Sequence, residues 1–599
     1  MKKLPIIIIT FFLLVCFSNS CSEGFFEKTP LGSTSENIFY SEQGLDALLI
    51  GTYGVLKGYS YGGSIQNWAF GSVASDDAYK GSEATDQPDG NEIERWQVMT
   101  TNLYIVHKWR TTIGMGINRA NEVLRILKNT TGLDPGDENR IRSEARFLRG
   151  LFNFEAWLVF NNIPIITEDT EDPKLVSNVN PEGAVLQHII SDLMYAAEYL
   201  PHRQSQVGRP TKYAAMALAA RAYLQVLDYA SAKPLLDEII TNGGYELMDN
   251  FFDNYRIAHN NNTESIFEIQ ATVNDVSSSP NAQMGIQLNH PMGSDIGTCC
   301  GFHQPSQNLV NAYRVDENGL PMFDTFNDTD LKNDQGIQSY ETFIPFEDEV
   351  DPRLDWTISR RGIPYRDWGI NRGKDWQRDQ ANGGPYLPAS KAFFNKSERR
   401  TLSTSSGWAS GVNANNYRYL RLTHVILWRA EVAAAEGDLD KARDLINMIR
   451  RRAANEVVMG RVQIYELPST AYPWGPGSTD ADYLIGGFVD WDQPAASYKI
   501  GEYSSFADKK EAMRAVQWEL RLEFATEGHR FFDLRRWDNL PADLKVESMA
   551  ETLNSFARAD ERIRTFMKGA TFQEFAKYQP IPQTQIDLQP DILVQNLGY

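Results

Sequence analysis

The sequence predicts a mainly α-helical protein in which tetratricopeptide-like hairpins form a scaffold and a large irregular insertion, rich in loops and short strands, interrupts it. Two observations carry this prediction. Apolar residues repeat at helical spacing over about 36–250, and a second block of the same kind follows at about 416–455. Between them, about 250–415 is rich in Gly, Asn, Asp, Pro and aromatic residues, which is typical of loops and short strands.

The first helical segments show amphipathic stripes. One stripe advances in steps of four and three residues through Ile113, Ile117, Ala120, Leu124 and Leu127. A second runs through Ile141, Ala145, Leu148 and Phe152. This second helix is expected to end at Asn161-Asn162-Ile163-Pro164, because proline stops helices.

Two segments resemble tetratricopeptide hairpins, which place small residues where two helices touch. In the first, helices are expected at roughly 212–228 and 231–241, with Ala220 facing Ala232. In the second, Ala430 faces Ala442, at the same separation of 12 residues. The helical solenoid is therefore interrupted rather than contiguous.

The chain is predicted to divide into a signal peptide at 1–20 and a single folded unit at 21–599. Within the unit, the C-terminal part at about 456–599 opens with a second insertion at about 455–508. Short strands are expected at Ser265–Ile269 and Trp356–Ile358. Long irregular segments inside a compact protein are usually functional, so the binding function is expected in the insertions and in the loop from Ser75 to Trp96.

The N-terminus has the layout of a secretory signal peptide. Lys2 and Lys3 precede an apolar run from Leu4 to Phe17, which is shorter than a membrane-spanning helix. Ser20 then precedes Cys21, the arrangement that lipoprotein signal peptidase cuts. Cys21 is therefore expected to carry lipid that holds the protein on a membrane, and a plain secreted protein is the alternative.

Charge and cysteine content exclude several classes of protein. The net charge is −20, from 58 basic and 78 acidic residues, without a basic block. Binding to nucleic acid or to anionic lipid by charge is therefore not expected. The adjacent Cys299 and Cys300 leave two alternatives open, a strained vicinal disulfide or two free buried thiols.

Catalytic signatures are missing from the sequence. It contains no Gly-x-Ser-x-Gly elbow, no phosphate-binding loop and no His-Glu-x-x-His zinc motif, so no cofactor is expected. The acidic run Asp324–Asp334 suggests calcium, but it lacks the central glycine and closing glutamate of an EF-hand, and a solvated loop is favoured. Paired carboxylates for glycoside hydrolysis stay open as a weak alternative.

Aromatic residues are the positive signal for function. The insertions interleave polar residues with Trp356, Tyr365, Trp368, Trp376, Tyr386 and Trp408. Sugar rings pack their C–H faces on such rings while their hydroxyls need planar polar partners, so a glycan-binding surface is predicted. The competing interpretation is that these rings form the core of a strand-poor insertion.

Several motifs resemble the SusD/RagB family. They are Cys21 followed by Ser22–Glu27, the stretch Ser143–Arg149, the block Glu519–Trp537, and the closing segments Tyr578–Pro582 and Asn596–Tyr599. The resemblance implies a non-catalytic lipoprotein exposed on the cell surface, with a SusD-like fold. Such a protein captures oligosaccharides, or peptides in the RagB branch, and delivers them to a partner TonB-dependent outer-membrane transporter. A surface glycoside hydrolase is the less favoured alternative.

Ligand contacts in this family come from variable loops, so the site residues are predicted by location. The predicted ligand-binding residues are Asp77, Tyr79, Lys80, Trp96, His303, Gln304, Trp368, Arg372 and Trp376. By contrast, Trp109 is expected in the core, because it has helical spacing from Ile113. Charged residues of the Glu519–Trp537 block are expected to form structural ion pairs, among them Glu527, Arg530 and Arg536.

Overall fold

The computed structural model describes residues 36–599 except 61, 276–280, 283–284, 286–287, 293–299, 340, 342, 389–394, 399–411 and 463–488. The predicted signal peptide, Cys21, Cys299 and Trp408 lie outside the described residues. Cys300 is disulfide-bonded, and its partner is not among the described residues.

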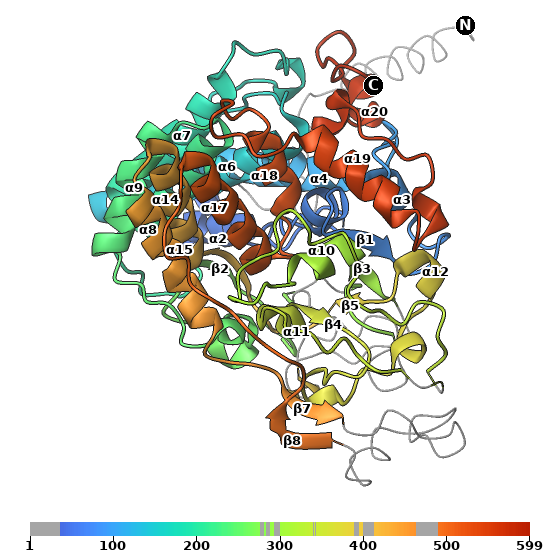
Figure 1. Cartoon of the computed structure of the whole chain (residues 1–599). Helices are drawn as coiled ribbons and strands as arrows, with labels where there is room; N and C mark the ends of the chain where they lie inside the picture. The colour runs from blue at the N-terminus through green and yellow to red at the C-terminus, as the bar shows by residue number, and fades with distance from the viewer. Residues whose placement is uncertain are drawn as a thin grey trace, which may run out of the picture.

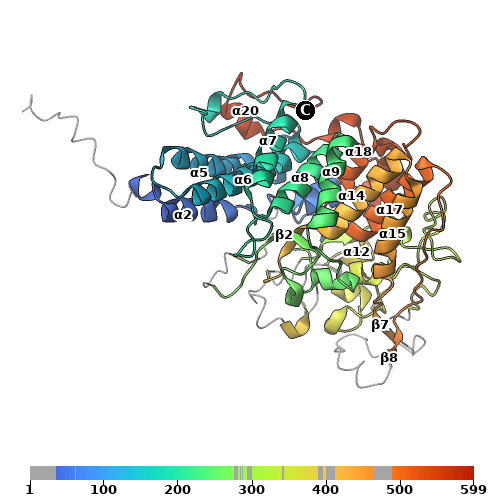
Figure 2. The ribbon, with the colours of Figure 1, turned by 90° about the vertical axis from the view of Figure 1, so that its left-hand side faces the viewer.

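A continuous layer of helices lies along one side of the molecule (Figure 2). Its first members are α2 (Glu42–Tyr53), α5 (Asn118–Asn129) and α6 (Pro135–Phe160). The short helices α3 (Pro88–Glu94) and α4 (Leu103–Trp109) lie between α2 and α5 in sequence. The stripe predicted over 113–127 spans a π-helical turn, Arg110–Ile117, and then α5. Trp109 is buried, as expected.

Local sequence sets both ends of α6. Asp134 accepts a hydrogen bond from the Gly136 N–H and Pro135 stands at the first helical position, where its missing N–H costs nothing. The helix ends at Phe160, before Asn161, whose φ is +58°. The predicted end at 161–164 is confirmed.

Both predicted hairpins are confirmed. α7 (Ala184–Tyr199) precedes the first, formed by α8 (Lys212–Gln225) and α9 (Tyr229–Asn242). The second is formed by α14 (Leu422–Glu436) and α15 (Leu439–Ala453). The four facing alanines, Ala220, Ala232, Ala430 and Ala442, are all fully buried, which permits the close helix contact that their spacing predicted.

The two hairpins pack directly against each other although about 180 residues separate them in sequence. Across the α9–α14 contact, the Tyr229 hydroxyl donates to Glu431 at 3.0 Å and Lys233 pairs with Glu436 at 2.8 Å. Strand β2 (Ser265–Ile269) pairs with β6 (Tyr417–Arg421), near the two ends of the insertion. The insertion therefore leaves and re-enters the scaffold at one place.

The irregular half lies on the lower side of the scaffold in Figure 1 and contains short helices and two-stranded ladders. Its helices include α10 (Gln307–Ala312), α11 (Arg353–Thr357) and α12 (Gln380–Gly383). Its ladders pair β1 (Ala78–Gly81) with β3 (Phe302–Pro305), β4 (Ile358–Ser359) with β5 (Leu387–Pro388), and β7 (Met459–Val462) with β8 (Val489–Pro494). The predicted strand at Ser265–Ile269 is confirmed, whereas at Trp356 and Thr357 the prediction is wrong because α11 extends to Thr357.

The C-terminal helices complete the scaffold. They are α17 (Lys509–Phe524), α18 (Arg530–Trp537), α19 (Met549–Asp560) and α20 (Gln583–Leu588). Arg530 pairs with Asp76, Arg536 pairs with Glu431, and Glu527 pairs with Arg421. These charged residues are structural, as predicted.

A buried cluster of charges joins the irregular half to the scaffold. Glu523 of α17 pairs with Arg421 at 2.8 Å, Arg452 at 2.5 Å and Arg353 at 3.3 Å, and all four side chains are buried. Burial alone raises the pKa of Glu523, but the three guanidiniums outweigh it and hold that pKa well below its usual range. One carboxylate thus links guanidiniums from α11, α15 and the end of β6.

Candidate functional site

The structure brings two of the predicted site segments together. Strand β1 carries Tyr79 and Lys80, and it pairs antiparallel with β3, so that Tyr79 lies opposite Gln304. His303 lies next to Gln304 on β3, with its ring 5.6 Å from that of Trp68. These segments are more than two hundred residues apart in sequence.

The side chains of β1 and its flank are nevertheless buried, which argues against ligand contact. The Tyr79 hydroxyl donates to Asp560, and Arg564 lies 3.7 Å from the centre of its ring. The Lys80 ammonium donates to the carbonyls of Glu83 and Asp86 at 2.7 and 2.6 Å. Asp77 pairs with Arg521 at 2.9 Å. Each of these polar groups is both buried and bonded to a protein partner, so a ligand could not reach them in this structure.

The predicted residues on the other loops are also largely buried. Trp96 donates from Nε1 to the Ala74 carbonyl at 2.8 Å. Trp368 and Trp376 form a small core cluster with Tyr365, Ile257 and Leu387. Gln304 donates to the Tyr386 carbonyl, and burial lowers the pKa of His303 to about 3, so His303 is neutral at physiological pH. Arg372 alone is half-buried, and its contact with ligand stays a prediction.

The acidic run considered for calcium does not converge on one point. Asp324 pairs with Arg514, and Asp330 accepts from Asn311 at 3.0 Å. In the part of the chain that the structure describes, no group of three or more His, Cys, Asp or Glu side chains is placed to hold a metal ion. Asp334 is buried 3.9 Å from Arg361, and burial, only partly offset by Arg361, raises its pKa to about 7.

The raised pKa of Asp334 makes stability depend on pH. Folded Asp334 keeps its proton up to about pH 7, whereas an unfolded aspartate loses it near pH 4, so this residue's contribution to stability falls as the pH rises between the two values. We expect Asp334→Asn to be more stable than the wild type at pH 8, by roughly 1–3 kcal/mol, with a smaller gap at pH 5. Denaturant unfolding at both pH values measures this gap. Asp324→Asn, at an exposed position, is the control. If its stability relative to the wild type rose with pH by the same amount, the burial of Asp334 would not be the cause.

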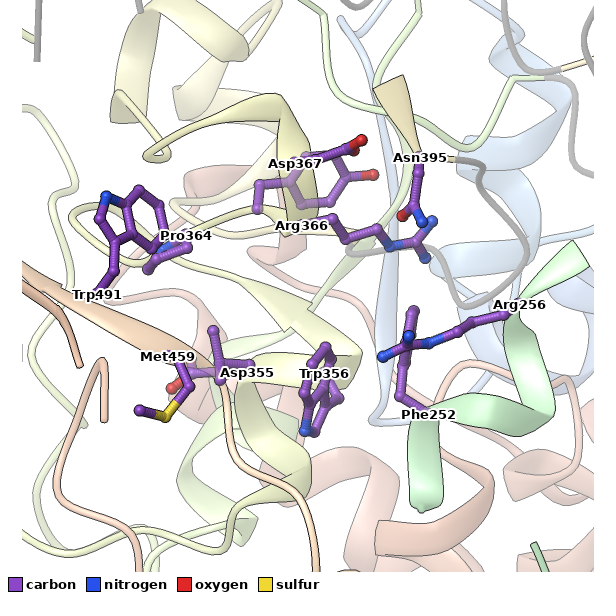
Figure 3. Close-up of a pocket in the computed structure, with 12 residues that line it drawn as sticks. Phe252, Arg256, Asp355, Trp356, Pro364, Arg366, Asp367, Asn395, Met459 and Trp491 are labelled. Carbon is purple, nitrogen blue, oxygen red and sulfur yellow. The ribbon is translucent and has the colours of Figure 1, made fainter. Parts of the chain in front are cut away.

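An open pocket lies instead between the two insertions (Figure 3). Its volume is about 240 Å³. Segments distant in sequence line it: the turn Phe251–Tyr255, helix α11, the turn Arg366–Trp368 and the β7–β8 hairpin. We call this pocket the aromatic cleft. Its aromatic residues are Phe252, Trp356, Tyr365 and Trp491, and its polar residues are Arg256, Asp355, Arg366, Asp367 and Asn395.

Aromatic rings form two walls of the cleft. On one side Trp356 stacks on Phe252, with ring centres 4.8 Å apart and an angle of 18° between the planes. The Trp356 Nε1 donates to the Glu456 carbonyl at 3.2 Å, which fixes the ring. On the other side Trp491 is 45% exposed, and its ring lies against Gly460, where a Cβ atom would come within 2.7 Å of it.

The charged groups of the cleft are held in place by protein contacts. The guanidiniums of Arg366 and Arg256 lie 4.7 and 5.7 Å from the centre of the Phe252 ring. Arg256 also pairs with Glu456 at 2.9 Å. The Asp367 carboxylate accepts from the backbone N–H groups of residues 396 and 397, which positions Asn395 at the rim.

The two acids that line the cleft are both engaged in contacts. Asp355 pairs with Arg360 at 2.6 Å and accepts from the Tyr498 hydroxyl, while Asp367 holds backbone N–H groups. Neither carboxylate is therefore without a protein partner, as a general acid or base waiting for substrate would be. The arrangement therefore suits binding by stacking and hydrogen bonds, with donors and acceptors at the edges of apolar rings.

Only some of the residues that line the aromatic cleft could be predicted from the sequence. Trp356 was among the insertion aromatics, and the sequence around Trp491 lies in the second predicted insertion. Phe252 and Arg256 lie beyond the loop that follows the first hairpin and carry no local signal. Their role follows only from the packing of Phe252 against Trp356.

Comparison with known proteins places the chain in a family. The model of the SusD family matches residues 263–599, which is more than half of the chain. A second family model, described as starch-binding and associating with the outer membrane, matches residues 25–224. A SusD-like protein of Bacteroides ovatus is 27% identical over 289 residues, 45% of this chain and 50% of that protein, and the SusD-like protein P25 of Formosa agariphila is 24% identical over 45% and 52%. The chain spans about half the length of these curated relatives.

Solved structures share the fold over nearly the whole chain. A SusD superfamily protein of Bacteroides vulgatus has a TM-score of 0.66 at 18% identity, covering 94% of this chain and 100% of that one. Surface glycan-binding protein A of Bacteroides thetaiotaomicron, solved with laminarihexaose, has a TM-score of 0.60 at 17% identity over 92% and 99%. Among the described residues, no helix combines the length and apolar character needed to span a membrane. The helical hairpins, the irregular half and the family match together establish that this chain belongs to the SusD family.

Proposed function

We propose that this protein is a lipid-anchored, surface-exposed glycan-binding protein of an outer membrane, which captures oligosaccharides in the aromatic cleft and delivers them, uncleaved, to a partner TonB-dependent transporter. Family membership supports the general role. The fold shared with a laminarihexaose-binding protein and with a laminarin-binding SusD-like protein supports a glycan as the ligand. Lipid on Cys21 would supply the anchor.

The observation that carries the proposal is the pairing of fixed aromatic walls with fixed polar edges. The Trp356–Phe252 stack and the exposed Trp491 offer flat apolar faces to the C–H faces of a sugar ring. Arg366 and Asn395 lie beside these faces, within reach of the hydroxyl groups of a bound ring. Because the protein already orders these groups, binding loses little conformational entropy.

Calorimetry on the purified soluble domain tests the proposal. We expect oligosaccharides of one linkage class, with laminarihexaose as the first probe, to bind with a dissociation constant on the order of micromolar. Chromatography of the incubated sugar should show an unchanged chain length. Binding to a mixed peptide pool but to no glycan would favour the peptide receptor instead. Shortened sugar products would show a hydrolase.

Gly460 makes room for Trp491, so its substitution should weaken ligand binding. Its φ is +110°, and an added Cβ would lie 2.7 Å from the Trp491 ring and 2.9 Å from Pro364. We expect Gly460→Ala to displace the ring and lower the affinity roughly 3- to 10-fold in the same calorimetry. Gly336→Ala is the matched control, because Gly336 also has a positive φ but has no atom within 4 Å of the added Cβ. Equal losses in both variants would mean that backbone strain, and not Trp491, sets the effect.

A further inference from the structure

The two walls of the aromatic cleft offer few hydrogen-bonding groups to a ligand. One wall is the stack of Trp356 on Phe252, and the one polar side-chain atom of that stack, the Trp356 Nε1, already donates to a main-chain carbonyl. The other wall groups Trp491 with Met459 and Pro364, whose side chains are a thioether and a hydrocarbon ring (Figure 3). The only polar side-chain atom of Trp491 is Nε1, at the edge of its ring. A ligand between the walls therefore meets ring faces and apolar side chains.

The polar groups that can bond a ligand lie together at one edge of the cleft. Figure 3 shows Arg366, Asp367 and Asn395 next to one another there. Two backbone N–H groups bond the Asp367 carboxylate, but a carboxylate has about four acceptor positions, so it can still accept from a hydroxyl. The other charged lining residues, Arg256 and Asp355, are held in ion pairs with protein groups. The hydroxyls of a bound sugar thus find partners at this edge and not on the walls.

A sugar ring that lies between two apolar walls has to be apolar on both of its faces. In a pyranose chair, equatorial hydroxyls point outward around the ring, whereas axial groups cover the two faces. When the hydroxyls at C2, C3 and C4 are all equatorial, as in gluco- and xylo-configured rings, these positions present only C–H groups to the faces. An axial hydroxyl at C2, as in mannose, or at C4, as in galactose, replaces one of these C–H groups on one face.

We propose that the aromatic cleft selects pyranose rings whose ring hydroxyls are all equatorial and rejects rings that carry an axial hydroxyl. An axial hydroxyl would lie against one apolar wall, where it leaves water and finds no partner. Equatorial hydroxyls instead reach the edge formed by Arg366, Asp367 and Asn395. The inference rests on the proposed function, because it names the class of sugar that the cleft takes.

The size of the cleft limits how much of an oligosaccharide this selection acts on. Its volume of about 240 Å³ is smaller than the roughly 300–1,000 Å³ of pockets that enclose a drug-sized ligand. The cleft therefore encloses a short part of the sugar, and the remaining rings extend into solvent. The configuration of the enclosed part, more than the length of the chain, should set the affinity.

Calorimetry on matched oligosaccharides tests the inference. The probes are hexasaccharides of glucose, mannose and galactose, each prepared in the same set of linkages. Within the linkage that binds most tightly, we expect the glucose compound to bind roughly 5- to 150-fold more tightly than the other two, the range for one buried hydroxyl left without a partner. If the mannose or the galactose compound binds as tightly as the glucose compound, the inference fails and the proposed function stands. If none of the compounds binds, glycan capture is contradicted and the inference fails with it.

Opening a wall should weaken this discrimination, because an axial hydroxyl would then face water. Trp491→Ala opens one wall and Trp356→Leu opens the other, and an axial hydroxyl of a bound ring points toward one of them. We expect one of the two variants to lower the ratio of glucose to mannose affinity at least about 3-fold relative to the wild type, in addition to any loss of affinity for both sugars.

Tyr199→Ala, which removes an exposed ring on α7, is the control and should keep the wild-type ratio. A ratio that is unchanged in both wall variants would show that the apolar walls do not select the configuration. Thermal unfolding checks that each variant is folded, and the comparison of sugars on the wild-type protein depends on neither variant.

Discussion

Trp491→Ala should weaken oligosaccharide binding roughly 10- to 100-fold, the effect expected when an aromatic side chain at the centre of a binding site is removed. Trp491 forms one wall of the aromatic cleft and is 45% exposed before any ligand binds. Because the ring lies against Gly460 and is almost half exposed, its loss leaves little of the core uncovered. Calorimetry measures the change in affinity, and thermal unfolding should show a nearly unchanged Tm.

Tyr199→Ala is the matched control for Trp491. Tyr199 is an aromatic residue of similar exposure, 42%, but it lies on α7 in the helical layer. The affinity of this control should equal that of the wild type. If Trp491→Ala binds as tightly as the control does, the aromatic cleft is not the ligand site, and the half-buried Arg372 would become the next position to test.

The second large effect is expected on stability, at Glu523. Glu523→Gln keeps the size of the side chain but leaves Arg353, Arg421 and Arg452 with one negative charge fewer in a buried cluster. Breaking a buried ion pair from one side costs about 3–5 kcal/mol, because the remaining charge is no longer compensated. We therefore expect a loss of this size in the free energy of unfolding, measured with denaturant at pH 7.

Glu502→Gln provides the comparison for Glu523. Glu502 pairs with Arg451 at the surface, where the two side chains are 47% and 56% exposed, so the loss should stay below about 1 kcal/mol. Similar losses in the two variants would show that the buried cluster contributes no more than an ordinary surface pair. A loss of glycan affinity in Glu523→Gln without a loss of stability would also contradict a structural role for Glu523.

The scaffold could be predicted from the sequence because its signals are local. The separation of 12 residues between Ala220 and Ala232, repeated at Ala430 and Ala442, depends only on helix geometry and a short turn. The direct packing of α9 on α14 was not predicted, because in the sequence the two hairpins are separate blocks of an interrupted solenoid. A strand was predicted at Trp356–Ile358 because bulky residues favour strands, but Trp356 and Thr357 close the short helix α11.

The burial of the predicted ligand-binding residues could not be predicted in the same way, because burial depends on distant partners. Asp77, Tyr79 and Lys80 have the polar, turn-like sequence of an exposed loop. In the structure Arg521 and Asp560, more than four hundred residues further along, supply partners to Asp77 and Tyr79. No pattern within a short window contains that information.

The aromatic cleft lies in the regions that were predicted to carry function, although different residues form it. In the sequence Phe252 is an ordinary apolar residue after a helix, and only its stacking on Trp356 gives it a place in the cleft. Trp368 and Trp376, which stand in loop-like sequence, instead fill the interior beneath the turn that carries Arg366. Composition predicted the region, whereas side-chain packing decides which rings face outward.

The contact between α9 and α14 has a consequence for how this protein can change over evolutionary time. The helices on either side of the insertion contact each other directly. The entropy cost of closing the intervening polypeptide into a loop therefore changes little when that polypeptide lengthens or shortens. Deletions and insertions in the loops of this polypeptide can therefore leave the contact between α9 and α14 intact, provided that Arg353, which pairs with Glu523 of the scaffold, is kept. The loops of the irregular half can thus change length over evolutionary time while the helices that support them keep their arrangement.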